Sequence, residues 1–214
     1  MRMRKEESVA TYSSYVRGDL SYRDPRHLQY KKRDLVLTYV KPGRALIDIG
    51  CGTGEFVCKL KDRFEELVGI DPDPFAIEFS RNRLGEEKKI AFYQQELGSL
   101  GFPTEHFDVC LCLDVLEHIQ DLNPLLDEIR RILKPGGEMI VSVPNWYDIL
   151  YAKILRRNPN HVHTLPPWMW VKAFRRAGFS VSSYRAVDFP VFKSDFLSRK
   201  IPILGMCIVM RAVR

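Results

Sequence analysis

The stretch Leu46–Phe56 has the sequence LIDIGCGTGEF and decides the fold. Its first four residues predict a buried strand, three glycines then predict a tight turn, and a helix is expected to begin near Glu55. Glycine has no Cβ and tolerates positive φ, so a ligand can lie directly against the backbone of such a turn. A strand, a glycine-rich turn and a helix in this order predict an α/β protein that binds its ligand at the carboxyl end of a strand.

The spacing of the glycines indicates which ligand. Gly50, Gly52 and Gly54 follow Asp48 in the pattern D-x-G-x-G-x-G. A dinucleotide fingerprint, G-x-G-x-x-G/A, requires a small residue where this chain has Glu55, because the helix must pack closely on the strand. The pattern instead resembles motif I of the class I methyltransferases that use S-adenosylmethionine (SAM). Asp48 beside the turn is expected to hold loop amides or the cofactor's ammonium group through charge-assisted bonds.

Further segments follow in the order that this resemblance predicts. Asp71 ends a second apolar strand and can accept hydrogen bonds from both ribose hydroxyls. After a third predicted strand, the resemblance implies that Glu96 binds the adenine amino group and that the Leu97 amide reaches the ring. Asp114 and Val115, where the fourth strand ends, would flank the methionine moiety. The cofactor-binding residues expected from the resemblance are Asp48, Gly50, Cys51, Gly52, Gly54, Asp71, Pro72, Glu96, Leu97, Asp114 and Val115.

Apolar strands alternate with helical stretches along the chain, which predicts a parallel sheet covered by helices on both faces. Strands are expected near 45–49, 67–70, 90–94, 107–113, 137–143, 179–187 and 203–213, and helices near 25–40, 55–63, 74–84, 122–133 and from 167. The predicted fold is α/β, a doubly wound, Rossmann-like αβα sandwich. The resemblance adds a seven-stranded, mostly parallel sheet with the last strand antiparallel.

One domain spanning residues 1–214 is expected, because 45% of the residues are hydrophobic and 28% are charged. Residues 1–40 are expected to form an N-terminal lid and helix. Residues 146–170 and 189–202 exceed what a minimal fold needs, and we expect them to build a cap over the substrate. The alternative is that their apolar side chains only pack on the sheet.

Composition also bears on the compartment. The first residues, MRMRKEES, lack the apolar core of a secretory signal, and the apolar run 201–210 is too short to span a bilayer. Five cysteines, an odd number, favour a reducing compartment. A cytoplasmic location is therefore expected.

The net charge of +6 is unevenly distributed. Residues 153–214 contain 12 Lys or Arg and 2 acids (12 − 2 = +10), and residues 1–152 contain 21 Lys or Arg and 25 acids (21 − 25 = −4). A basic C-terminal third can attract an anionic substrate, a membrane surface or RNA. It can equally be an ordinary solvated surface.

Two histidines are candidate catalytic residues, because proton removal assists an oxygen nucleophile. His118 follows the fourth strand beside Glu117, where both residues can act in chemistry or only cap the next helix. His163 can serve as a base, contact the substrate or make a structural hydrogen bond. The pair His161-x-His163 has no Cys or carboxylate near it in sequence, so no metal site is expected.

The resulting functional prediction is methyl transfer from SAM, with S-adenosylhomocysteine (SAH) as product, to a small molecule that is hydrophobic or anionic. The region around the fourth strand resembles the group that includes quinone-biosynthesis methyltransferases. An Asn/Asp-Pro-Pro-aromatic motif is missing there, which argues against a nucleic-acid acceptor. The alternatives are an RNA or protein methyltransferase, or a SAM-binding partner subunit without turnover. A monomer or homodimer is expected.

Overall fold

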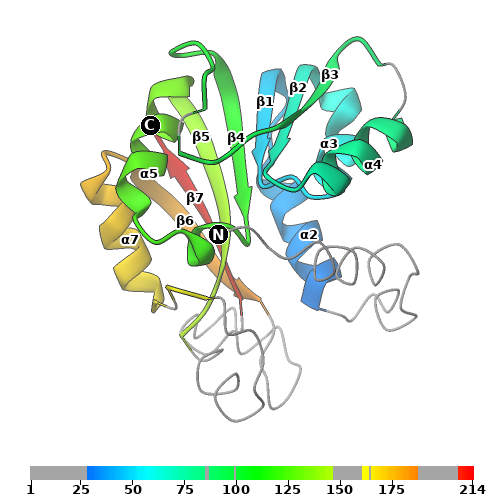
Figure 1. Cartoon of the computed structure of the whole chain (residues 1–214). Coiled ribbons are helices and arrows are strands. Elements are labelled where there is room, and N and C mark those ends of the chain that lie inside the picture. Colours follow the sequence, from blue (N-terminus) through cyan, green and yellow to red (C-terminus); the bar gives the residue numbers. More distant parts are fainter. Residues whose placement is uncertain (1–27, 85–86, 99, 147–160, 164, 188–206) are drawn as a thin grey trace.

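A seven-stranded sheet organises the protein in a computed structural model (Figure 1). The structure describes residues 28–84, 87–98, 100–146, 161–163, 165–187 and 207–214. The strand order is β3-β2-β1-β4-β5-β7-β6. The strands are β1 (Gly43–Ile49), β2 (Phe64–Asp71), β3 (Ile90–Gln94), β4 (Phe107–Leu113), β5 (Leu133–Pro144), β6 (Ser180–Val187) and β7 (Cys207–Val213).

The strand directions confirm the predicted topology. Strands β1 to β5 pair in parallel, whereas β7 lies antiparallel between β5 and β6. The chain order reverses between β1 and β4, so the loops that follow these two strands leave the sheet side by side. An open α/β sheet binds its ligand at such a switch point, beyond the carboxyl ends of the strands.

Helices cover both faces of the sheet, as a doubly wound sandwich requires (Figure 1). The helices are α2 (Leu28–Tyr39), α3 (Glu55–Leu60), α4 (Pro74–Leu84), α5 (Leu122–Ile132) and α7 (Pro167–Arg176), with short 3-10 turns η2 (Lys61–Arg63) and η3 (Leu116–His118). Apolar residues of α5 and α7 pack in one core cluster, and those of α2, α3 and α4 pack in a second on the opposite face.

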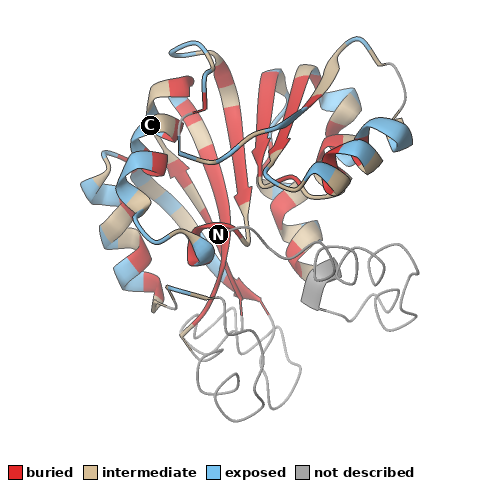
Figure 2. Ribbon diagram, viewed as in Figure 1, coloured by how far each residue is buried: buried red, intermediate tan, exposed pale blue. Residues whose placement is uncertain are grey.

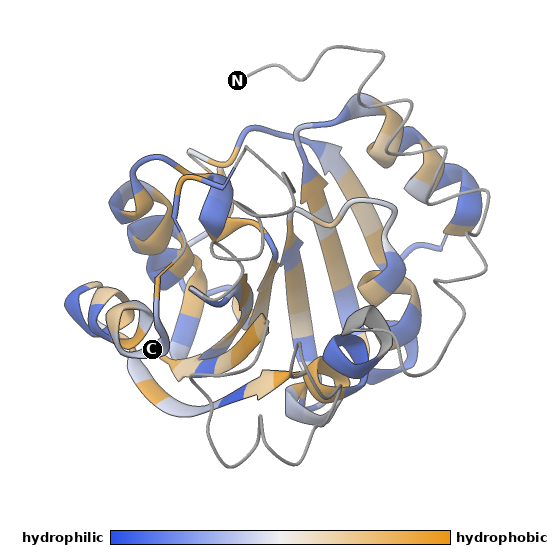
Figure 3. Ribbon diagram, turned by 90° about the horizontal axis from the view of Figure 1, so that it is seen from below, coloured by the Kyte–Doolittle hydropathy of each residue, from blue (hydrophilic) through white to orange (hydrophobic). Residues whose placement is uncertain are grey.

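Burial on both faces explains why the central strands have near-continuous apolar sequences. The last five residues of β1 are all buried, and β4 is buried from Val109 to Cys112. Figure 2 shows this burial in the central strands, whereas the outer helical surfaces, the loops and parts of the edge strands β3 and β6 are exposed. Viewed from below, the strands are also the most hydrophobic part of the molecule (Figure 3).

The sequence of α5 explains both its start and its packing. Asp121 caps the helix, its side chain accepting a hydrogen bond from the Asn123 backbone amide at 3.1 Å. Its buried residues lie at helical spacings and form one apolar stripe, Leu125, Leu126, Ile129 and Ile132. Of the two alternatives considered for Glu117 and His118, capping of α5 does not apply, because Asp121 caps the helix and both residues lie in η3 before it.

Among the element boundaries that differ from the sequence prediction, the start of β5 and the end of α3 have clear structural reasons. Strand β5 begins at Leu133, earlier than the predicted 137, because Leu133 pairs with Phe107 before the ladder shifts register. The predicted helix 55–63 ends as α3 at Leu60 and continues as η2. Neither difference moves the loops at the carboxyl edge.

Much of the expected lid and cap lies outside the described residues, namely 1–27, 147–160 and 189–202. The described part of the N-terminal segment packs on the sheet, with Val36 and Val40 buried in the core. Among the described residues, no helix is long and apolar enough to cross a membrane.

Candidate cofactor site

The loop after β1 requires glycine at three positions, which have φ between +51° and +72°. A Cβ on Gly50 would lie 2.3 Å from Val115 Cγ2, and one on Gly54 would lie 2.8 Å from Phe92 Cζ. A Cβ on Gly52 would meet nothing within 4 Å. Gly50 and Gly54 are therefore needed for packing, and Gly52 presents bare backbone to open space.

Backbone hydrogen bonds hold this loop against β2. The amides of Gly50 and Cys51 both donate to the Ile70 carbonyl, at 2.8 and 3.0 Å. The Ser80 hydroxyl of α4 donates to the Gly52 carbonyl at 3.0 Å. These hydrogen bonds fix the conformation of the loop before a ligand binds. Burial raises the pKa of the Cys51 thiol, so this side chain stays protonated.

Asp71 occupies the carboxyl end of β2 beside the loop. One carboxylate oxygen accepts a hydrogen bond from the Gly52 amide and the other from the Asp73 amide, each at 2.9 Å. Burial raises the pKa of Asp71, and the two backbone amides oppose that shift. Each oxygen retains a second lone pair, so the side chain can still accept bonds from ligand hydroxyls.

Asp48 differs from the expectation of a charged residue that holds the loop. Its side chain is only 2% exposed, and burial, followed by repulsion from Asp71, raises its pKa to about 8. At neutral pH the carboxyl is therefore mainly protonated in the ligand-free protein. Among the described residues, none donates a hydrogen bond to it, and the loop amides bind Ile70 and Asp71 instead.

The expected adenine-binding residues follow β3 at the same edge of the sheet. The Gln95 amide donates to the Asp71 carbonyl at 3.1 Å, which brings the start of this loop beside Asp71. Glu96 is exposed, and Leu97 is half-buried and packs against the core. Pro72, which directly follows Asp71 in the chain, is exposed. The structure thus gathers these residues at one edge.

Asp114, at the end of β4, is held in an uncommon conformation with φ of 55°. The Ser142 hydroxyl donates to its Oδ1 at 2.7 Å, and Lys32 of α2 pairs with its Oδ2. Sequence reasoning missed Lys32. The spacing of residues in α2 could have indicated it: Lys32, Val36 and Val40 are four residues apart and so lie on one face of the helix. All three side chains are buried in the structure.

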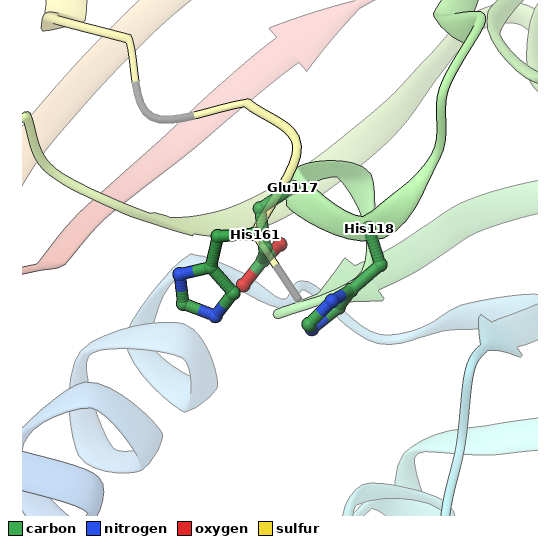
Figure 4. Close-up of side chains that lie close together, drawn as sticks. All are labelled: Glu117, His118 and His161. Atoms are coloured by element: carbon green, nitrogen blue, oxygen red, sulfur yellow. The ribbon is translucent and has the colours of Figure 1, made fainter. Parts of the chain in front are cut away.

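The two candidate catalytic histidines have different surroundings. His163 Nε2 lies 3.2 Å from the Gln120 carbonyl, a structural hydrogen bond of the kind considered from the sequence. His118 is exposed and lies near Glu117 and His161, and the ligand atoms of these three residues are all within 4.8 Å of one another (Figure 4). The sequence argument against a metal considered only near neighbours in the chain and so missed this grouping.

Comparison with known proteins shows which family the central region of the chain resembles. A family model described as a methyltransferase domain matches residues 47–141. Over these residues the chain is similar to methyltransferase domains. This segment includes the glycine loop, Asp71, Glu96 and Asp114, and the family together with the fold implies SAM as the cofactor.

Relatives and solved structures agree with the methyltransferase domain. A Mycolicibacterium smegmatis protein described as a probable S-adenosylmethionine-dependent methyltransferase is 28% identical over 65% of this chain and 53% of its own length. A ubiquinone biosynthesis O-methyltransferase of Alkalilimnicola ehrlichii is 34% identical over 48% of this chain and 42% of its own length. The chain therefore spans about half or less of the curated relatives it matches.

The same fold occurs in a Haloferax volcanii protein solved in complex with the Trm112 methyltransferase activator. The TM-score is 0.74, and the match covers 94% of this chain and 96% of that chain at 18% identity. At this identity the likeness bears on the fold alone, and it confirms the predicted class I methyltransferase architecture.

Proposed function

We propose that this chain transfers a methyl group from SAM to a small-molecule acceptor. The observation that carries the proposal is the open backbone at Gly52 beside Asp71, within the methyltransferase domain. Bare backbone next to a carboxylate with spare lone pairs suits a ligand that brings ribose hydroxyls and a charged amino-acid moiety.

SAM supplies the reactive methyl group on its sulfonium, so the protein must mainly bind, orient and exclude water. Asp71 would accept the ribose hydroxyls, and Glu96 and Leu97 would contact the adenine. Val115 would pack along the methionine moiety, next to Gly50. Asp48, mainly protonated without ligand, would lose its proton when the positively charged cofactor lies nearby.

A small acceptor is supported by the similarity to a ubiquinone biosynthesis O-methyltransferase. We further propose that residues 146–170 and 189–202 cover this acceptor, and that the basic C-terminal third attracts an anionic one. Trp168 of α7 is 58% exposed and offers an aromatic surface within the first of these segments.

The test is a screen for SAH formation with the full chain, SAM, and extracts of metabolites, lipids or RNA. The expected result is turnover with a metabolite or lipid fraction, which Asp71→Ala lowers when SAM is limiting. Asp62→Ala, which changes an exposed aspartate of η2, is the matched control and should leave turnover unchanged. Turnover only with RNA, or none with any fraction, would overturn the proposal.

A further inference from the structure

Glu117, His118 and His161 form a compact set of metal-ligand side chains next to the carboxyl end of β4. Glu117 and His118 belong to η3, and His161 belongs to the separate segment 161–163. Figure 4 shows the three side chains gathered around one point. Their ligand atoms lie within 4.8 Å of one another, and the two imidazole centroids are 5.0 Å apart.

The backbone, and not only the side chains, holds these two segments together. The amides of Val162 and His163 both donate to the Glu117 carbonyl, at 2.7 and 3.1 Å. This clamp fixes His161 beside the residue that supplies the carboxylate. His163 is turned toward Gln120 by its own hydrogen bond, so only one histidine of the HVH sequence belongs to the set.

The chemistry of the three ligands suits a transition-metal ion. Two imidazoles and one carboxylate are typical donors for zinc, and a magnesium site would use oxygen ligands. Ligand atoms about 2.1 Å from a tetrahedral ion lie roughly 3.4 Å apart. The distances between the ligand atoms must therefore shorten by on the order of 1 Å when an ion binds. Rotation of the exposed His118 side chain to another rotamer can provide part of this change.

Burial gives a second argument for a cation. Glu117 is only 2% exposed, and a positive charge beside a buried carboxylate stabilises its ionised form. A divalent ion would supply that charge directly. His118, at the exposed end of the set, leaves the ion accessible to water or a ligand.

We propose that Glu117, His118 and His161 bind one divalent transition-metal ion of the zinc class, with at least one coordination position open. The site lies three residues beyond Asp114, at the same edge of the sheet as the cofactor site. An oxygen atom of the acceptor can occupy this open coordination position. The acceptor that fits the site is therefore a molecule with an oxygen atom that can bind the metal ion. This extension rests on the proposed function, whereas ion binding does not.

Calorimetry and elemental analysis of the metal-free full chain, titrated with zinc chloride, test the site. One equivalent of zinc per chain is expected, with millimolar magnesium unable to compete. Glu117→Gln and His161→Ala should each weaken zinc binding by at least about tenfold. His163→Ala is the matched control, since it removes the neighbouring histidine and should leave zinc affinity unchanged.

Because Glu117 is buried, its variant could lose its fold, so the exposed His118→Ala provides a second test with the same expected loss. SAH affinity, measured on every variant, reports an intact cofactor site independently of the metal. Zinc binding that none of the three variants weakens, or no saturable binding at one equivalent, would overturn the metal site. If the unmodified chain does not bind SAH, the proposed function is contradicted, whereas the result for the metal site still stands.

Discussion

Replacing Asp48 by asparagine is expected to stabilise the protein increasingly as the pH rises from about 5 to about 7.5. Burial and Asp71 raise the pKa of Asp48 from 3.8 to about 8 in the folded chain. Between these values the unfolded carboxyl is ionised while the folded one stays protonated, so the unfolded state binds fewer protons. Stability therefore falls with rising pH in this window, and the fall stops only when the folded carboxyl also ionises, near pH 8.

The magnitude follows from the size of the shift. One pKa unit corresponds to about 1.4 kcal/mol, so Asp48 lowers the free energy of unfolding by about 4 kcal/mol at pH 7 relative to an unshifted carboxyl. Asparagine has nearly the same shape and no such titration. The difference in unfolding free energy between the variant and the unmodified protein should thus increase by about 1 kcal/mol per pH unit.

Urea unfolding of both proteins at about pH 5, 6 and 7 measures this difference. Asp62→Asn, at an exposed position of η2, is the control for a general loss of negative charge. Parallel stability profiles for Asp48→Asn and the unmodified protein would refute the reasoning, because they would mean that Asp48 is already ionised in the folded state.

Three further substitutions test the site geometry. Gly50→Ala should lower the free energy of unfolding by about 2–4 kcal/mol, since its Cβ would lie 2.3 Å from Val115 and its φ is +72°; thermal unfolding measures this. Gly52→Ala should cost only about 1–2 kcal/mol, because its Cβ meets no atom, yet it should abolish SAH binding by filling the cofactor's space; equal effects of the two alanines on stability would contradict this contrast. Lys32→Met should destabilise by about 1–3 kcal/mol, and adding Asp114→Asn should recover part of that loss in a double-mutant cycle; additive effects would mean that the pair is not coupled.

Local sequence patterns, beginning with the strand and glycine turn of Leu46–Phe56, are sufficient to predict most of the fold. Its glycines have positive φ in the structure, and each apolar run that follows forms a strand of the sheet. These features are local, because a buried strand needs a continuous apolar run and a tight turn needs glycine. The order of the strands then follows from right-handed crossovers and the family resemblance.

Other features of the site depend on contacts between distant parts of the chain. Lys32 meets Asp114 across 82 positions, and His161 meets Glu117 only because the backbone clamps the two segments together. The protonated state of Asp48 likewise depends on complete burial and on Asp71, which belongs to another strand. Helical spacing places Lys32 on the buried stripe of α2, but no pattern in the neighbouring residues identifies the distant partner of Lys32, His161 or Asp48.

Calorimetric titration of the full chain with SAH tests the central claim, that the loop at Gly50–Gly54 and Asp71 forms a SAM site. We predict saturable binding of one SAH per chain. Asp71→Ala should weaken it by about 1–3 kcal/mol, roughly 5- to 150-fold, and Asp62→Ala should leave it unchanged. No binding at millimolar SAH, or an affinity that Asp71→Ala does not alter, would contradict the account.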